Sequence, residues 1–303
     1  MNRREKEALT RLAGGKIRFG CAMSQLTTFR VGGDAEALYE AQEPEDLGRF
    51  MAYLYKAGIP YLVVGRGSNL LVKDEGVAGV VILLSGSLAT AEMEKTNHSK
   101  VLAGAGLPIS DFLIYCRHAG LGGLEFLAGI PGTVGGAVTM NAGAYGGEVG
   151  SRVKELECMA PQGHVTVRNG PDLPFSYRKL ELERGSVILR VRFNMRLESE
   201  KTVADRMSGY LKKRRERQPL EYPSAGSVFR NPPNNHAGRL IEEAGLKGER
   251  IGGAMISKKH ANFIVNTGGA TARDILALLS FAQEKVQKAT GIKLEPEIRV
   301  VGG

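Results

Sequence analysis

The sequence predicts an α+β protein built of two or three domains. Its 303 residues, of which 43% are hydrophobic, are enough to bury a substantial core, and this length favours more than one domain. Segments with the apolar spacing of helices occur among short strand-like segments, without internal repeats or low-complexity linkers. The chain is therefore expected to be globular.

Two amphipathic helices are predicted in the first half of the chain. Segment 44–58, PEDLGRFMAYLYKAG, places its apolar residues on one helical face and ends at a glycine. Segment 109–120, ISDFLIYCRHAG, has a similar pattern. Strand-like runs accompany these helices at residues 61–65, 79–84 and 100–106.

Two alternating segments follow, HVTVR at 164–168 and SVILRVRFNMRL at 186–197, and both patterns are typical of half-buried strands. A helical pattern then starts near Thr202, runs into the basic cluster KKRRER at 212–217, and stops at Pro219. That cluster is either a solvated helix face or an attractant for anionic ligands.

The last helix is predicted over residues 271–291. Thr271 and Asp274 resemble a capping box at its start, and Gly291 is a typical helix end. The closing segment, EIRVVGG, reads as a strand that can return to the first region and join the two ends of the chain.

The charge balance favours an anionic partner. Lys and Arg number 41 against 32 Asp and Glu, which gives a net charge of +9 and suits nucleic acid, a membrane surface or a phosphorylated small molecule. The N-terminal segment lacks the apolar core of a secretion signal, and the longest apolar run, GVVILL, is too short to span a bilayer. We therefore expect a cytoplasmic protein without membrane insertion.

Cysteine and histidine usage predicts no metal site. The three cysteines, Cys21, Cys116 and Cys158, are far apart and odd in number, so neither a disulfide framework nor a zinc knuckle is indicated. The five histidines show no metal-binding spacing. Difficult chemistry would need an organic cofactor.

The stretch GIPGTVGGAVTMNAGAYGGE, residues 129–148, contains seven glycines and no charge before its last residue. Glycine lets a backbone approach a ligand closely and present its N–H groups, which is how uncharged loops hold pyrophosphates. A second loop of this kind, VVGRGSNLL at 63–71, follows a strand-like segment. Together the two loops suggest a dinucleotide, whereas a glycine cluster alone would indicate tight turns.

The common dinucleotide fingerprints are incomplete. GRGSNL and GAGLPI each supply only part of G-x-G-x-x-G, and no G-x-x-x-x-G-K-[ST] loop is present. Neither a Rossmann nor a P-loop protein is therefore favoured.

Six segments, in order, resemble the signatures of the UDP-N-acetylenolpyruvoylglucosamine reductase (MurB) family of flavoenzymes. They are TTFRVGGDAE, VVGRGSNLLV, GLEFLAGIPGTVGGAVTMNAGAYGGE, FSYRKL, PSAGSVFRNP and LEPEIRVVG. The resemblance implies an FAD-binding fold of the vanillyl-alcohol-oxidase (PCMH) type with two subdomains and a C-terminal α+β substrate-binding domain. The implied limits are 1–95 with 292–303 for the first subdomain, 96–200 for the second, and 201–291 for the substrate domain.

The resemblance also implies the reaction and the cofactor. NADPH would reduce non-covalent FAD, which would reduce the enolpyruvyl ether of a UDP-sugar to its lactyl form during peptidoglycan precursor synthesis. The loop residues implied to hold the pyrophosphate are Gly65, Arg66, Gly67, Ser68, Asn69 and Leu70. The residues implied to line the rest of FAD are Pro131, Gly132, Thr133, Gly135, Gly136, Asn141, Gly143 and Ala144, with Arg299 near its phosphates.

Three side chains are implied to be catalytic. Arg178 would pair with the substrate carboxylate, because a planar guanidinium suits it. Ser227 would donate a proton to the carbon next to that carboxylate. Glu297, preferred over Glu295 because it precedes Ile298 and Arg299 as the family requires, would bond the developing enolate as an acid with a raised pKa. Without the resemblance, these residues read as a solvated arginine, a turn serine and solvent-facing glutamates.

Further residues implied to contact substrate are Tyr177, Arg217, Asn231, His260 and Asn262. Little room remains between FSYRKL and PSAGS for the tyrosine-bearing loop found in one form of the family, so the chain resembles the shorter form. We expect a monomer that binds NADPH and the UDP-sugar.

Two rival interpretations stay open at this point. A different flavin oxidoreductase with covalent FAD lacks an evident attachment residue. A basic nucleic-acid-binding protein would need aromatic residues among its Lys and Arg, yet aromatics form only 6% of the chain and Trp is absent.

Overall fold

The computed structural model describes residues 1–303 except for the side chain of Pro171, and the chain divides into two compact units. The larger unit comprises Met1–Phe19, Ala37–Arg66 and Gly79–Lys212, and the smaller comprises Gly20–Glu36, Gly67–Ala78 and Lys213–Gly303. Both are assembled from segments that are distant in the sequence. The three-domain division expected from the sequence stays a prediction.

An antiparallel five-stranded sheet is central to the larger unit, with the strand order β12-β11-β15-β7-β6. Helix α4 packs against β15 and β7, and α3 packs against α4. The fully buried rings of Phe112 on α3 and Phe193 on β15 lie 5.2 Å apart between centroids. The bounds are β6 Ala91–Met93, β7 Lys100–Gly104, α3 Ile109–His118, α4 Val134–Thr139, β11 Val153–Met159, β12 Val165–Asn169 and β15 Val187–Asn194.

A second, four-stranded sheet has the order β1-β2-β5-β3. Helices α1 and α2 pack against each other, and Tyr39 of β2 stacks on Phe50 of α2 with centroids 4.0 Å apart. As predicted, α2 ends at Gly58, whose φ of 66° is left-handed. The bounds are α1 Arg3–Leu12, β1 Ile17–Ala22, β2 Asp34–Ala41, α2 Pro44–Ala57, β3 Tyr61–Val63 and β5 Val77–Leu84.

Short strand pairs and one long helix complete the chain up to residue 217. The pairs are β8 Leu121–Gly122 with β16 Arg196–Leu197, β9 Gly143–Ala144 with β10 Gly147–Glu148, and β13 Phe175–Ser176 with β14 Lys179–Leu180. The helix is α5, Glu200–Arg217, which ends just before Pro219 as expected.

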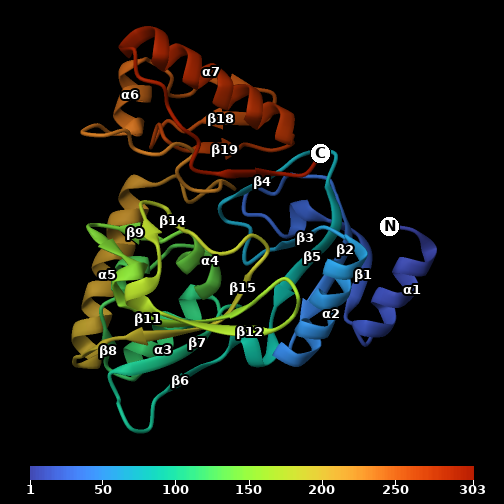
Figure 1. Cartoon of the computed structure of the whole chain (residues 1–303). Coiled ribbons are helices and arrows are strands. Elements are labelled where there is room, and N and C mark those ends of the chain that lie inside the picture. The colour runs from blue at the N-terminus through green and yellow to red at the C-terminus, as the bar shows by residue number, and fades with distance from the viewer. The chain divides into compact units, whose positions relative to one another are not determined.

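The smaller unit contains an antiparallel sheet, β17-β18-β19, packed against helix α7, and α6 packs against α7 (Figure 1). The predicted capping box at Thr271 and Asp274 is formed, and Gly291 is left-handed. The closing strand β20 pairs in parallel with β4, so the predicted return of the chain end is confirmed. The bounds are β4 Leu70–Val72, α6 Ala237–Glu243, β17 Arg250–Ile251, β18 Ala254–Ile256, β19 Ile264–Asn266, α7 Ala272–Thr290 and β20 Arg299–Val301.

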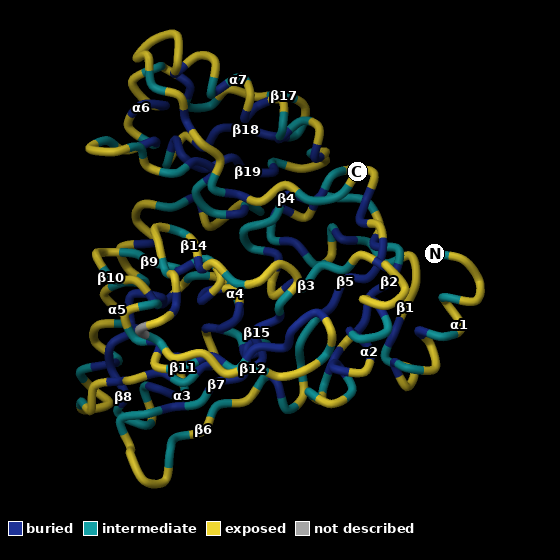
Figure 2. Tube along the Cα trace, in the orientation of Figure 1, coloured by how far each residue is buried: buried dark blue, intermediate teal, exposed yellow. Residues whose placement is uncertain are grey.

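Burial corrects two sequence predictions (Figure 2). Strand β12 is largely exposed rather than half-buried, because it lies at the edge of its sheet; Val165 and Val167 are 50% and 59% exposed. Strand β15 is nearly all buried, because it is the central strand. In addition, the glycine stretch contains a helix, α4, that its composition did not predict. No helix in the described part of the chain has both the length and the apolar character needed to cross a membrane.

Candidate active site

Gly65 and Thr133, one from each of the two glycine loops predicted to hold a dinucleotide, meet in the larger unit. A Cβ atom placed on Gly65 would lie 2.5 Å from Oγ1 of Thr133, which is closer than any real Cβ contact. On the other side, the N–H of Gly135 donates to the carbonyl of Ala105 at 2.9 Å, and a Cβ on Gly135 would lie 2.7 Å from the Ala105 Cβ. The absence of side chains therefore allows the close approach of these backbones.

Main-chain donors are left unpaired at this junction. Among the residues that the structure describes, no protein acceptor bonds the N–H groups of Gly65, Arg66, Gly132 or Thr133. Backbone N–H groups need partners, which here must be water or a ligand. A neutral cradle of amides suits a pyrophosphate and a flavin, so these residues fit FAD.

Asn141 is part of the scaffold beside this cradle. Its side chain is 2% exposed, and its Nδ2 donates to Oε2 of Glu148 and to the carbonyl of Ser176, both at 3.0 Å. Its Oδ1 accepts the N–H of Gly150 at 3.0 Å. The side chain of this predicted cofactor residue thus connects the glycine stretch to the β13–β14 hairpin.

Arg178 lies in the turn of that hairpin, next to the glycine stretch. A Cβ on Gly143 would be 3.1 Å from Nη1 of Arg178, and the guanidinium lies 5.1 Å from the ring centroid of Tyr177. The φ of Arg178 is 58°, an uncommon conformation for a residue with a side chain. Such backbone strain is often found at functional sites.

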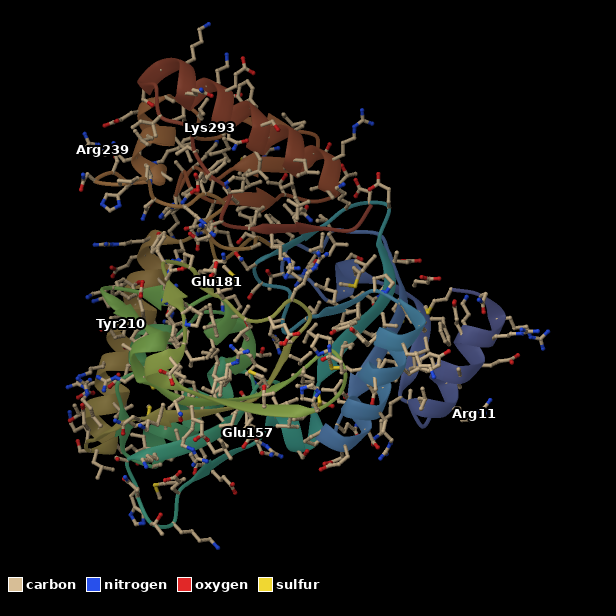
Figure 3. The ribbon with its side chains drawn as sticks, in the orientation of Figure 1. Arg11, Glu157, Glu181, Tyr210, Arg239 and Lys293 are labelled. Carbon is tan, nitrogen blue, oxygen red and sulfur yellow. The ribbon has the colours of Figure 1, made fainter. Side chains whose placement is uncertain are left out.

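Tyr145 was given no role from the sequence, although it lies within the glycine stretch. With Gly146 it forms the turn between β9 and β10, and its φ of 53° is left-handed. Its ring is 41% exposed and stacks on Tyr210 of α5, labelled in Figure 3, with centroids 4.9 Å apart. The sequence could have singled out Tyr145, because turns of this kind favour Asn, Asp or Gly at its position and an aromatic residue there is unusual.

Ser227 and Glu297 lie on neighbouring extended segments of the smaller unit. The N–H of Glu297 donates to the carbonyl of Val228 at 2.8 Å, and Phe229 forms a bridge with Pro296. Glu297 is half-buried, whereas Glu295 is exposed. Arg178 belongs to the larger unit.

The predicted pyrophosphate loop contributes to the same part of the smaller unit. Nδ2 of Asn69 donates to the carbonyl of Glu297 at 3.2 Å, and the N–H of Arg299 donates to the carbonyl of Asn69 at 2.9 Å. Gly67 has a φ of 59°, and a Cβ there would lie 2.3 Å from the carbonyl oxygen of Leu26. Gly67 to Leu70 thus connect directly to the segment of Glu297.

The predicted substrate residues of the smaller unit have structural partners. Oδ1 of Asn231 accepts the N–H of Ala237 at the start of α6, at 3.0 Å. Burial lowers the pKa of His260, whose Nδ1 accepts the N–H of Asn262 at 3.2 Å. Asn262 is 3% exposed, and its amide bonds the backbone of Phe229.

The basic cluster is not uniformly solvated. Arg217 is exposed, but Arg214 is only 7% exposed. Helical spacing could have predicted the burial of Arg214, since Val203, Met207 and Arg214 lie on one inward-facing stripe of α5.

No group of three or more metal-ligating side chains occurs among the residues described. Cys116 and Cys158 are buried, and burial raises the pKa of their thiols to about 12 and about 11.

Comparisons with known proteins agree with this arrangement. Residues 218–301 match the model of the UDP-N-acetylenolpyruvoylglucosamine reductase C-terminal domain, and residues 35–168 match that of an FAD binding domain. The reductase of that name from Geobacter metallireducens is 46% identical over 280 residues, which are 92% of each chain. That from Caldanaerobacter subterraneus subsp. tengcongensis is 40% identical over 292 residues, 96% of this chain and 95% of its own.

A solved structure extends the match to three dimensions. The crystal structure of UDP-N-acetylenolpyruvylglucosamine reductase (MurB) from Thermus caldophilus has a TM-score of 0.81 and 40% identity, covering 94% of this chain and 98% of its own. The predicted α+β FAD-binding fold is confirmed, and neither rival interpretation is supported. The chain belongs to the UDP-N-acetylenolpyruvoylglucosamine reductase family.

Proposed function

We propose that this chain reduces the enolpyruvyl ether of a UDP-N-acetylglucosamine derivative to UDP-N-acetylmuramate, with FAD as cofactor and NADPH as electron donor. The reaction is a step in peptidoglycan precursor synthesis. The observation that carries this proposal is the amide cradle formed where Gly65 meets Thr133, within a chain that matches the reductases over nearly its whole length. The partner of the cradle has to accept hydrogen bonds from main-chain donors.

The unpaired N–H groups of Gly65, Arg66, Gly132 and Thr133 would hold FAD. When bound, FAD would take hydride from NADPH and deliver it to the enolpyruvyl double bond. The protein has to orient the substrate, stabilise negative charge on its carboxylate side and supply one proton.

Arg178 would orient the substrate by bidentate pairing with its carboxylate. The turn conformation and the ring of Tyr177 place the guanidinium beside Gly143, which is itself a predicted FAD residue, and this supports the role.

Ser227 would give its hydroxyl proton to the carbon next to the substrate carboxylate, while Glu297 would hydrogen-bond to the carboxylate oxygens as charge builds there. Their positions on adjacent hydrogen-bonded segments support this division of roles. The serine alkoxide would then recover a proton from solvent. A serine is acidic enough only because the receiving carbon has become strongly basic.

The central experiment separates the two half-reactions. The purified protein should be yellow, release flavin on denaturation, lose its colour anaerobically with NADPH, and regain it on addition of the UDP-enolpyruvyl sugar. A Ser227→Ala variant should still be bleached by NADPH but should not be reoxidised by the sugar. Unchanged turnover in this variant would refute the role of Ser227, and a protein unable to retain FAD would refute the function.

We also propose that the enzyme acts as a cytoplasmic monomer without a nucleic-acid partner, with NADPH and the sugar using one pocket in turn. Family membership and the positive charge that suits two anionic ligands support this. Light scattering tests the oligomeric state, and competition between NADP and the sugar tests the shared pocket.

A further inference from the structure

Four chain segments of the smaller unit form one hydrogen-bonded ladder around Ser227 and Glu297. The N–H of Val228 donates to the carbonyl of Asn262 at 2.9 Å, and the carbonyl of Val228 accepts the N–H of Glu297 at 2.8 Å. The ladder continues through Arg299 to Asn69. The order of segments is therefore 260–263, 227–230, 295–299 and 69–72.

The side chain of Asn262 closes the first junction. Its Oδ1 accepts the N–H of Phe229 at 3.0 Å, and its Nδ2 donates to the carbonyl of Phe229 at 2.8 Å. The amide thus acts as a peptide group would in a strand, and pairs both main-chain groups of Phe229. Because Asn262 is only 3% exposed, water cannot easily reach the main-chain groups of Phe229, which would be left without partners if the amide were removed.

The side chain of Asn69 closes the last junction, by its bond to the carbonyl of Glu297. Asn69 lies in the loop expected to hold the FAD pyrophosphate. The same asparagine therefore belongs to the cofactor loop and touches the segment of the proposed acid.

We propose that Asn262 and Asn69 are positioning residues, whose amides hold the segments of Ser227 and Glu297 in register for proton transfer. This rests on the proposed function, and it assigns Asn262 a role within the protein rather than in contact with substrate. Ser227 is two residues before the clamped Phe229, and Glu297 follows Pro296, the bridge partner of Phe229. Loss of the clamp would free Phe229 from the side chain of Asn262 and leave the serine segment bonded to segment 260–263 through main-chain groups alone, so the serine would be less precisely placed.

The first test is Asn262→Ala, with the two half-reactions measured separately by anaerobic stopped flow. A misplacement of about 1 Å costs roughly 100-fold in a reaction that depends on alignment. We expect flavin reoxidation by the sugar to slow roughly 100-fold more than flavin reduction by NADPH. Equal slowing of both steps, or no slowing, would overturn the proposal.

Asn266→Ala is the matched control. Asn266 is also buried in the smaller unit, at 8% exposure, and its Nδ2 donates to the carbonyl of Phe29 at 3.0 Å while its Oδ1 accepts two N–H groups. Both substitutions should lower Tm, but only Asn262→Ala should change the ratio of the half-reactions. The same change in ratio for both variants would mean that general destabilisation is the cause, and would reject positioning.

The pH dependence of flavin reoxidation in an Asn262→Asp variant provides a second test. This test can be made even if the alanine variant does not fold. The carboxylate would face the carbonyl of Phe229 and cannot donate to it, whereas the protonated acid has the shape and the donor of the amide. Burial raises the pKa of such a carboxyl, so the reoxidation rate relative to wild type should rise as pH falls. A ratio that is flat with pH would contradict the proposal.

Two readouts separate this inference from the proposed function. In the chain stripped of FAD, the N–H of Phe229 should exchange with solvent faster in Asn262→Ala than in Asn266→Ala, and the opposite order would overturn the clamp.

Asn69→Ala should slow flavin reoxidation more than flavin reduction, as Asn262→Ala does. If it only weakens FAD binding, Asn69 is a cofactor ligand and its positioning role is rejected. If wild type itself is not reoxidised by the sugar, the proposed function fails instead.

Discussion

The approach of Gly65 to Thr133 leads to a quantitative prediction for Gly65→Ala. The new Cβ would lie 2.5 Å from Oγ1 and 3.2 Å from Cγ2 of Thr133. To reach an ordinary contact distance, the loop must retreat by about 1 Å. This moves the N–H groups of Gly65 and Arg66 away from the FAD that we propose they hold.

The expected loss of FAD affinity follows from the hydrogen bonds that this movement would break. A hydrogen bond to a charged group contributes about 1.5–3 kcal/mol, and 1.4 kcal/mol is a factor of ten in affinity. Loss of one such bond should therefore weaken FAD binding about 10- to 150-fold. Titration of the stripped protein with FAD, followed by flavin fluorescence, measures this change.

A second variant tests whether removing the clash between the new Cβ and Thr133 restores FAD binding. Thr133→Ala removes Oγ1 and Cγ2, so the double variant Gly65→Ala/Thr133→Ala should bind FAD more tightly than Gly65→Ala alone. The threonine is also the N-cap of α4, and its loss should cost about 1 kcal/mol of stability. The steric reasoning is refuted if Gly65→Ala binds FAD as wild type does, or if the double variant recovers nothing.

Gly209→Ala is the control for a glycine substitution as such. Gly209 is exposed within α5, and no atom lies within 4 Å of a Cβ placed there. The substitution should raise the free energy of unfolding by about 0.5–1 kcal/mol without changing FAD affinity.

Three further predictions concern the scaffold. In native protein at pH 8, a thiol reagent should react with Cys21 and leave Cys116 and Cys158 unmodified, because burial raises the pKa of those two thiols to about 12 and about 11. All three cysteines should react in urea. Rapid labelling of Cys116 or Cys158 in the native protein would contradict their burial. Hydrogen bonds from the N–H groups at the helix start lower the pKa of Asp274 in the folded protein. The contribution of Asp274 to stability is therefore fully present at pH values above its pKa in the unfolded chain, and it is lost as pH falls through its pKa in the folded protein. Asp274→Ala should therefore cost about 0.3–1 kcal/mol near pH 7 and less in acid, by urea unfolding, and a cost independent of pH would contradict this. Leu278→Ala, at a fully buried site, should cost about 2–5 kcal/mol by the same assay, and a loss below that range would show that the core collapses around the cavity.

Local patterns in the sequence determined helices α2, α3, α5 and α7 and the chemistry of the loops, whereas α1, α4 and α6 were not predicted. Helix α7 could be predicted with both ends, because its capping box and its terminal Gly291 act within a few residues. The two glycine-rich loops indicated a ligand of the pyrophosphate kind for a similar reason, since glycine determines how closely a backbone can be approached. The named roles of Arg178, Ser227 and Glu297 came from resemblance to a family and stay proposals.

Only the tertiary structure decided which distant groups meet. Spacing along the chain cannot reveal that Gly65 touches Thr133, or that the amide of Asn262 pairs with Phe229, because these contacts depend on how separate segments pack. The exposure of β12 at a sheet edge has the same origin. A residue's type limits the bonds it can make, but its partners are set by the segments that folding places around it.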